Sequence, residues 1–121
     1  MSLTPREFRR GDIVRARFDP VEGSEQGGVR PALVISPAII NRSGTVVLLA
    51  AITSRGLDRV YPYETLLEVG DGGLSRASKV MLRQLRTMDK SRISGHLGSL
   101  DAGTMLQVDA ALAIAVGLHP L

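Results

Sequence analysis

Two apolar stretches rich in β-branched residues decide the expected fold: Pro31–Ser36 (PALVIS) and Val46–Thr53 (VVLLAAIT). Each has the length of a strand, and Asn41–Gly44 between them holds the Asn, Ser and Gly residues that are typical of a turn. Apolar runs bounded by turn residues predict buried β-strands joined by a short connection. The chain is therefore expected to be built on a β-sheet.

Upstream of these stretches, Asp12–Phe18 alternates between apolar and charged residues. Val14, Ala16 and Phe18 fall on one face, and Arg15 and Arg17 fall on the other. A period of two residues predicts a strand with one buried face. Asp19–Arg30 follows and is rich in glycine and charge, so it predicts a long loop, and such loops often carry function.

Downstream of them, the sequence predicts three more strands, at Tyr63–Val69, Lys79–Thr87 and Gly95–Leu100. Two polar or glycine-rich segments are expected as loops, Ser54–Val60 and Gly70–Ser78. A single helical turn capped by Asp89 is expected at Asp89–Ile93.

The end of the chain predicts a helix. Asp101 is a good N-cap and Gly117 is a good terminator, so the helix should run to about Val116. Apolar residues recur along it at helical spacing: Met105, Val108, Leu112 and Ala115 or Val116. Short strands followed by one helix predict a mainly β fold, a small antiparallel β-barrel with an appended C-terminal α-helix, as one domain over residues 1–121.

Composition narrows the function classes. The chain has 121 residues, no cysteine and two histidines, so neither a disulfide framework nor a zinc site is expected. No apolar run has the length of a membrane span, and the first ten residues lack the apolar core of a signal peptide. A cytoplasmic protein without a membrane partner is therefore expected.

Charge is unevenly distributed along the chain. Residues 1–100 hold all fifteen basic and ten of the twelve acidic residues, a net charge of +5, and residues 101–121 hold a net charge of −2. Thirteen of the fifteen basic residues are arginine, whose planar fork matches phosphate oxygens. A polyanionic partner fits this pattern, although a coding bias toward arginine explains it equally well. With only two Phe and two Tyr, a broad base-stacking surface is not expected.

Three segments carry side chains that suit a polyanion. Gly23–Pro31 (GSEQGGVRP) places Glu25 and Arg30 five residues apart in a glycine-rich loop, where the backbone can approach a ligand. Taken alone, that pair is explained more simply as a salt bridge bracing the loop.

The second segment, Ile52–Gly56 (ITSRG), puts Thr53, Ser54 and Arg55 at the end of a strand, a set that suits either phosphate binding or an ordinary turn. In the third, QLRT at residues 84–87, alternation places Gln84 and Arg86 on one face and Arg83 and Leu85 on the other. For any one of these four residues taken alone, a solvated surface is the simpler explanation. A structural or surface role is expected for His96 and His119.

These segments, in this order, make the chain resemble the MazF/PemK toxins, the growth inhibitors of type II toxin–antitoxin systems. The resemblance spans Arg10–Leu118. It rests on GDIV (11–14), FDP (18–20), GSEQGGVRP (23–31), ALVISP (32–37), NR (41–42), ITSRG (52–56), YPYE (61–64), QLRT (84–87), DKSR (89–92) and VDAAL (108–112). It implies an SH3-like antiparallel β-barrel with a C-terminal helix, a fold shared with the CcdB gyrase poisons, acting as a homodimer.

The resemblance also implies a chemistry, a sequence-selective endoribonuclease that cuts single-stranded RNA without a metal or other cofactor. In such enzymes the 2′-hydroxyl of the RNA attacks the neighbouring phosphate and leaves a 2′,3′-cyclic phosphate and a 5′-hydroxyl. By the family pattern Arg30 and Thr53 are the catalytic pair, and Glu25 is the nearest candidate base. Four residues are expected to contact the substrate: Ser54, Arg55, Gln84 and Arg86. Arg55 and Arg59 could grip the RNA backbone.

A cognate antitoxin is a further implied partner, with an acidic, disordered tail that would suit the positive charge of residues 1–100. Subunit contacts are expected along the apolar stripe of the helix and near Lys79–Leu85. Three residues depart from the family pattern: Arg83 replaces a usual Asp, Arg15 a frequent aromatic residue, and Lys79 a frequent Val. Two alternatives stay open, a gyrase-poison-like inhibitor and a catalytically silent RNA-binding module.

Overall fold

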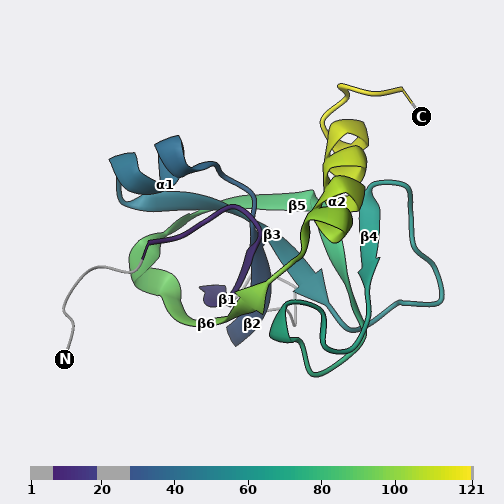
Figure 1. Cartoon of the computed structure of the whole chain (residues 1–121), viewed down its shortest axis with the longest axis horizontal. Helices are drawn as coiled ribbons and strands as arrows, with labels where there is room; N and C mark the ends of the chain where they lie inside the picture. The colour runs from purple at the N-terminus through teal and green to yellow at the C-terminus, as the bar shows by residue number, and fades with distance from the viewer. Residues whose placement is uncertain (1–6, 19–27, 121) are drawn as a thin grey trace.

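The computed structural model describes residues 7–18 and 28–120, and an antiparallel sheet dominates it (Figure 1). The strands of this described part are β1 (Asp12–Phe18), β2 (Gly28–Val34), β3 (Val46–Thr53), β4 (Glu64–Leu67), β5 (Ser78–Asp89) and β6 (Ile93–Ser99). They are ordered β4-β5-β3-β2-β1-β6 in one sheet. The helical elements are α1 (Ala38–Ser43), α2 (Ala102–Ala115) and the short 3-10 turns η1 (Asp71–Gly73) and η2 (Lys90–Arg92).

The predicted fold, a barrel-like antiparallel sheet followed by a C-terminal helix, is confirmed. The bounds of β1 and β3 coincide with the predicted strands, and Asp89 caps η2 as expected. β4 and β6 remain the two edges of the sheet, so the sheet curls without pairing into a closed ring.

The turn predicted at Asn41–Gly44 is wrong, because most of it belongs to helix α1. Asn41 is buried and its side chain donates to the carbonyls of Ser36 and Phe8, which ties the helix to the sheet. Ile39 and Ile40 on the same helix are exposed, so α1 has no apolar stripe that a sequence pattern would reveal.

Side-chain alternation divides the strands between two apolar clusters on opposite faces of the sheet. The first cluster includes Ile13, Leu33, Ile52, Val80 and Leu82 and is covered by α2. The second includes Phe8, Val14, Phe18, Val34 and Leu49. The two clusters keep the sheet buried on both sides over most of its length.

Helix α2 uses its predicted apolar stripe inside the protein. Val108 is fully buried, and Met105, Leu112 and Ala115 pack against the first cluster. Subunit contacts along this stripe can therefore involve only the surface that it leaves exposed. No helix in the described part of the chain is long and apolar enough to cross a membrane.

Strand β5 carries a wide bulge at Leu82–Gln84, three residues that lie between the partners of Ala50 and Ala51. In a regular strand Lys79 and Arg86, seven positions apart, would face opposite sides. The bulge brings both side chains to the same face of the sheet. The alternation predicted for Gln84 and Arg86 therefore does not hold as a regular pattern.

The cap of α2 gives a stability prediction. Asp101 Oδ1 accepts a hydrogen bond from the backbone N–H of Thr104 at 2.7 Å, and this bond lowers the pKa of Asp101 below its ordinary value. Replacing Asp101 by Ala is expected to lower the Tm at neutral pH, because the N–H of Thr104 loses its acceptor.

The difference in Tm should depend on pH in a defined direction. A lowered folded-state pKa means that the carboxylate stabilises the fold above its unfolded pKa and loses this effect as the pH falls through the folded value. The Tm difference between wild type and Asp101→Ala should therefore shrink in acid, and Asp101→Asn, which keeps an acceptor but not the charge, should lie between the two at neutral pH. A difference that stays constant from pH 7 into acid would contradict this account.

Candidate functional site

Arg30 and Thr53 extend from one face of the sheet at neighbouring strand ends. Arg30 lies on β2 and is paired with Ala16 of β1. The pairing of β2 with β3 ends at Ala32 and Ala51, and Arg30 and Thr53 are each two residues farther along. Because residues two apart in a strand share a face, both side chains extend from the face that these two alanines occupy.

The hydroxyl of Thr53 is held in place by its own loop. Thr53 ends β3 and is only 8% exposed, and its Oγ1 accepts a hydrogen bond from the backbone N–H of Arg55 at 3.1 Å. This bond fixes the oxygen and leaves the hydroxyl hydrogen able to donate to a ligand. Ser54 comes next, is exposed, and lines a cavity of about 180 Å³ together with Arg30.

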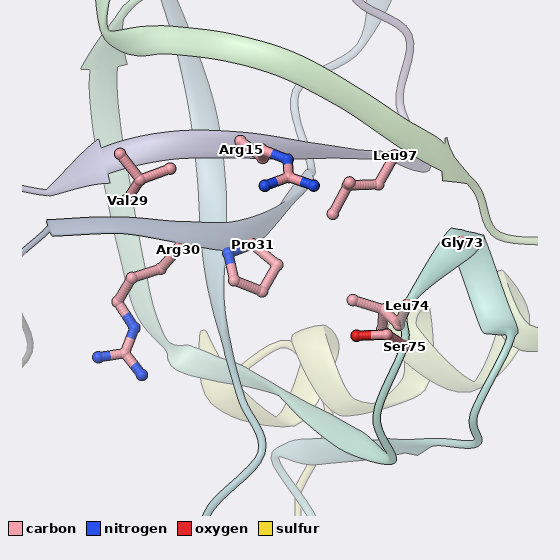
Figure 2. Close-up of a pocket in the computed structure, with 8 residues that line it drawn as sticks. All are labelled: Arg15, Val29, Arg30, Pro31, Gly73, Leu74, Ser75 and Leu97. Atoms are coloured by element: carbon pink, nitrogen blue, oxygen red, sulfur yellow. The ribbon is translucent and has the colours of Figure 1, made fainter.

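Arg30 also borders a second cavity of about 240 Å³, between β2 and the segment that follows η1 (Figure 2). Figure 2 shows the guanidinium of Arg30 directed away from that of Arg15, which lies over the same cavity. Gly73 forms part of the wall at φ +81°, and a Cβ there would lie 2.1 Å from the carbonyl oxygen of Leu97. Only glycine allows this close approach, so the wall is fixed against β6.

Arg86 reaches the same face through the bulge. It pairs with Leu49 of β3, which shares a face with Thr53, and its guanidinium carbon lies 5.1 Å from the ring centroid of Phe18. Phe18 ends β1 opposite Gly28, the first residue of β2. Arg86 thus lies on the side of the sheet from which Arg30 and Thr53 extend.

The structure does not bring all of the other predicted site residues close to Arg30 and Thr53. Gln84 lies in the bulge and is exposed, and the side chain of Arg55 is exposed in the loop after β3. Glu25 lies outside the described residues. The structure therefore places Arg30, Thr53 and Arg86 on one face of the sheet, and Ser54 in a cavity that Arg30 also lines.

Sequence reasoning gave Lys79 no role in the site itself, but the residue is 6% exposed and pairs with Thr53 across β3 and β5. Its Nζ lies 2.9 Å from Glu64 Oε1 and donates to the carbonyls of Gly56 and Arg59 at 3.0 and 2.9 Å. A buried ammonium needs such partners, since desolvating an unpaired charge is costly. The sequence feature that could have revealed this role is a lysine inside a strand of mostly apolar residues.

His96 has the structural role that was expected. Its Nε2 lies 3.4 Å from Asp12 Oδ1, which also accepts the hydroxyl of Ser99 at 2.8 Å. These contacts join β1 to β6. Among residues 7–18 and 28–120, no three His, Cys, Asp or Glu side chains gather in a way that would hold a metal ion.

The charge around the pair favours an anion. Within the described residues Arg30, Ser54 and Arg86 have no carboxylate partner, whereas Arg10 and Arg42 are each paired with one. Unpaired guanidinium groups beside a positioned hydroxyl can bind the non-bridging oxygens of a phosphodiester and stabilise added negative charge there. The site is therefore suited to phosphate chemistry.

Comparison with known proteins shows the family of the chain. Residues 9–116 match a family model described as a PemK-like, MazF-like toxin of type II toxin–antitoxin systems. A curated relative, Endoribonuclease MazF of Staphylococcus saprophyticus, is 38% identical over 114 residues, which cover 94% of this chain and 95% of that protein.

Solved structures give the same result. A crystal structure of MazF from Deinococcus radiodurans is similar with a TM-score of 0.76 and 32% identity, covering 93% of this chain and 98% of that one. A mycobacterial endoribonuclease in complex with its cognate antitoxin is similar with a TM-score of 0.76 and 25% identity, covering 92% of this chain and 96% of that one.

Proposed function

Because the chain belongs to the PemK-like, MazF-like toxins of type II toxin–antitoxin systems and is an endoribonuclease, we propose that it cuts single-stranded RNA without a metal. The 2′-hydroxyl of the RNA attacks the neighbouring phosphate, and the 5′-oxygen of the next nucleotide leaves. The products are a 2′,3′-cyclic phosphate and a 5′-hydroxyl. The protein has to align the attack, accept a proton and stabilise the charge that builds up on the phosphate.

The proposal rests above all on Arg30 and Thr53, which extend from one face at neighbouring strand ends. Arg30 donates to the non-bridging oxygens as negative charge develops on them. The Thr53 hydroxyl donates to the same phosphate, since its oxygen is already engaged by the N–H of Arg55. Glu25, outside the described residues, is the candidate general base.

Substrate contacts surround this pair in the proposal. Ser54 and Arg86 bind the nucleotides beside the scissile phosphate, and Arg55 and Gln84 contact the RNA farther along. Sequence selectivity is assigned to the loops at residues 19–29 and 54–60. The net positive charge of residues 1–100 draws the RNA to the protein.

The partners that we propose are a second copy of the chain and a cognate antitoxin, and the whole chain acts as one toxin domain in the cytoplasm. The acidic tail of the antitoxin covers the basic face that binds RNA. The second copy covers an apolar groove of about 340 Å³ beside α2. Its apolar lining includes Ile35, Leu48, Leu85, Leu112, Val116 and Leu118.

The decisive test of the function is incubation of the purified protein with single-stranded RNA in EDTA. Cleavage that leaves 2′,3′-cyclic phosphate ends, with DNA left intact, is the expected outcome because only RNA carries the attacking hydroxyl. Inhibition of gyrase supercoiling with intact RNA would favour the poison instead, and RNA binding without cleavage would favour a silent binding module.

The assigned catalytic pair makes a quantitative prediction. Arg30→Ala and Thr53→Val should each lower the single-turnover cleavage rate by about 100-fold or more, since each removes a donor to the phosphate. Arg9→Ala removes an exposed arginine from the segment before β1 and serves as the matched control. Circular dichroism should show that all three variants keep the wild-type fold. Wild-type cleavage by Arg30→Ala would refute the assignment.

The proposed dimer surface is tested by changing the rim of the groove. Val116 and Leu118 are 50% and 82% exposed. Replacing both residues by Glu would bury two charges in the proposed interface, which is costly. The double variant should be a monomer by light scattering at concentrations where wild type is a dimer. Leu106→Glu, on α2 and 69% exposed but outside the groove, should stay dimeric. A dimeric double variant would place the interface elsewhere.

A further inference from the structure

Four side chains near the start of β4 stack on one another. The rings of Tyr61 and Tyr63 are parallel within 1°, and their centroids are 5.3 Å apart. The guanidinium carbon of Arg59 lies 5.8 Å from the Tyr61 centroid, and that of Arg83 lies 5.3 Å from the Tyr63 centroid. These four residues, called here the arginine–tyrosine stack, form a continuous series of contacts, in which the Arg59 guanidinium also donates to the Tyr61 hydroxyl at 3.3 Å.

The stack lies at the surface. Tyr61 is 39% exposed, Arg59 and Arg83 are exposed, and Tyr63 is half-buried. The two phenylalanines, by contrast, belong to the second apolar cluster and are almost fully buried. In the described part of the chain neither Arg59 nor Arg83 has a carboxylate partner, so their charge is not neutralised.

We infer that the arginine–tyrosine stack is a second contact surface for single-stranded RNA, on which a base flanking the scissile phosphate stacks. Aromatic rings and guanidinium planes both accept a base face to face, and they do so with little preference among bases because every base has a π-face. The inference rests on the proposed function. It adds affinity along the RNA, and sequence selectivity stays with the loops at residues 19–29 and 54–60.

A buried ion pair fixes the stack from beneath. The ammonium of Lys79 donates to the carbonyls of Gly56 and Arg59 and to the carboxylate of Glu64. These three bonds use all three donors of the ammonium. Glu64 Oε1 also accepts the backbone N–H of Tyr61 at 3.0 Å. Arg59 and Tyr61 are therefore held through their backbones to one buried charge. Lys79 and Glu64 are positioning residues in this arrangement.

The same ion pair joins the stack to the catalytic face. Lys79 is the cross-strand partner of Thr53, and the carbonyl of Tyr63 accepts the N–H of Leu82 on the same strand as Lys79. Figure 1 shows the connection between β3 and β4 running out beside the sheet before it returns to begin β4. The stack and the proposed catalytic face are thus connected through β5 and this buried pair.

The experiment measures binding without cleavage. The probe is a fluorescently labelled single strand in which every ribose carries 2′-fluoro, so that the attacking hydroxyl is missing, and binding is followed by anisotropy. The double variant Tyr61→Leu, Tyr63→Leu should raise the Kd about tenfold, and Arg83→Gln should raise it by a smaller factor. Arg9→Gln, which removes the same charge from an exposed arginine outside the stack, should bind as wild type does.

A further variant separates stacking from simple charge attraction. Arg83→Lys keeps the charge and loses the guanidinium plane, so it should bind as weakly as Arg83→Gln. Full recovery by Arg83→Lys would overturn the stacking account. Because Arg83 is exposed, these variants test the inference even where the tyrosine variant fails to fold.

The positioning role is tested by a double-mutant cycle. Lys79→Met with Glu64→Gln removes both charges of the buried pair and should weaken probe binding as the tyrosine double variant does. Combining the two sets should give no further loss, because both act on the same surface. Additive losses would overturn the positioning role.

Failure of this inference and failure of the proposed function are distinguishable. Wild-type protein that neither cuts RNA nor binds the probe would overturn both. Wild-type protein that does both, while the tyrosine and Arg83 variants bind the probe as tightly, would overturn the stack alone.

Discussion

The bulge at Leu82–Gln84 decides which side chains share the face of Arg30 and Thr53. A strand allows only alternate residues on one face, so a regular β5 would offer either Lys79 or Arg86 there and bury the other among apolar residues. The extra residues of the bulge let both charged side chains reach one face while Val80 and Leu82 stay in the first apolar cluster. The catalytic face and the core are thus compatible in a single strand.

Burying Lys79 then restricts the shape of the loop that follows β3. A charge at 6% exposure requires a counter-charge and hydrogen-bond acceptors, and Glu64 together with two loop carbonyls supplies them. An ion pair of this kind contributes little net stability, because desolvation offsets most of the attraction. Its effect is geometric, since the loop after Thr53 can satisfy the ammonium only in a narrow set of conformations.

Patterns that recur within a single strand or helix were predictable from the sequence, and contacts between segments far apart in the sequence were not. The alternation of Asp12–Phe18 and the capping signal of Asp101 are local, and both were confirmed. The grouping of Arg30 with Thr53 came from the family resemblance, since their approach depends on a register between strands that spacing alone does not set. The bulge was missed because it interrupts the alternation used to find β5, and α1 was missed because its isoleucines face solvent.

In the proposed function, chemistry and RNA recognition therefore fall on different parts of the fold. Arg30, Thr53 and Arg86 stand on paired strands that two apolar clusters hold from both sides, which suits groups proposed to hold the scissile phosphate and its neighbours with little freedom. The arginines and tyrosines proposed to contact the rest of the RNA stand mainly on the β3–β4 connection, where sequence can change without disturbing the core. The Lys79–Glu64 pair is the link between these two parts: it adjoins Thr53 on one side and Tyr61 on the other. A change in the loop can thus alter which RNA is held while the groups at the phosphate keep their positions.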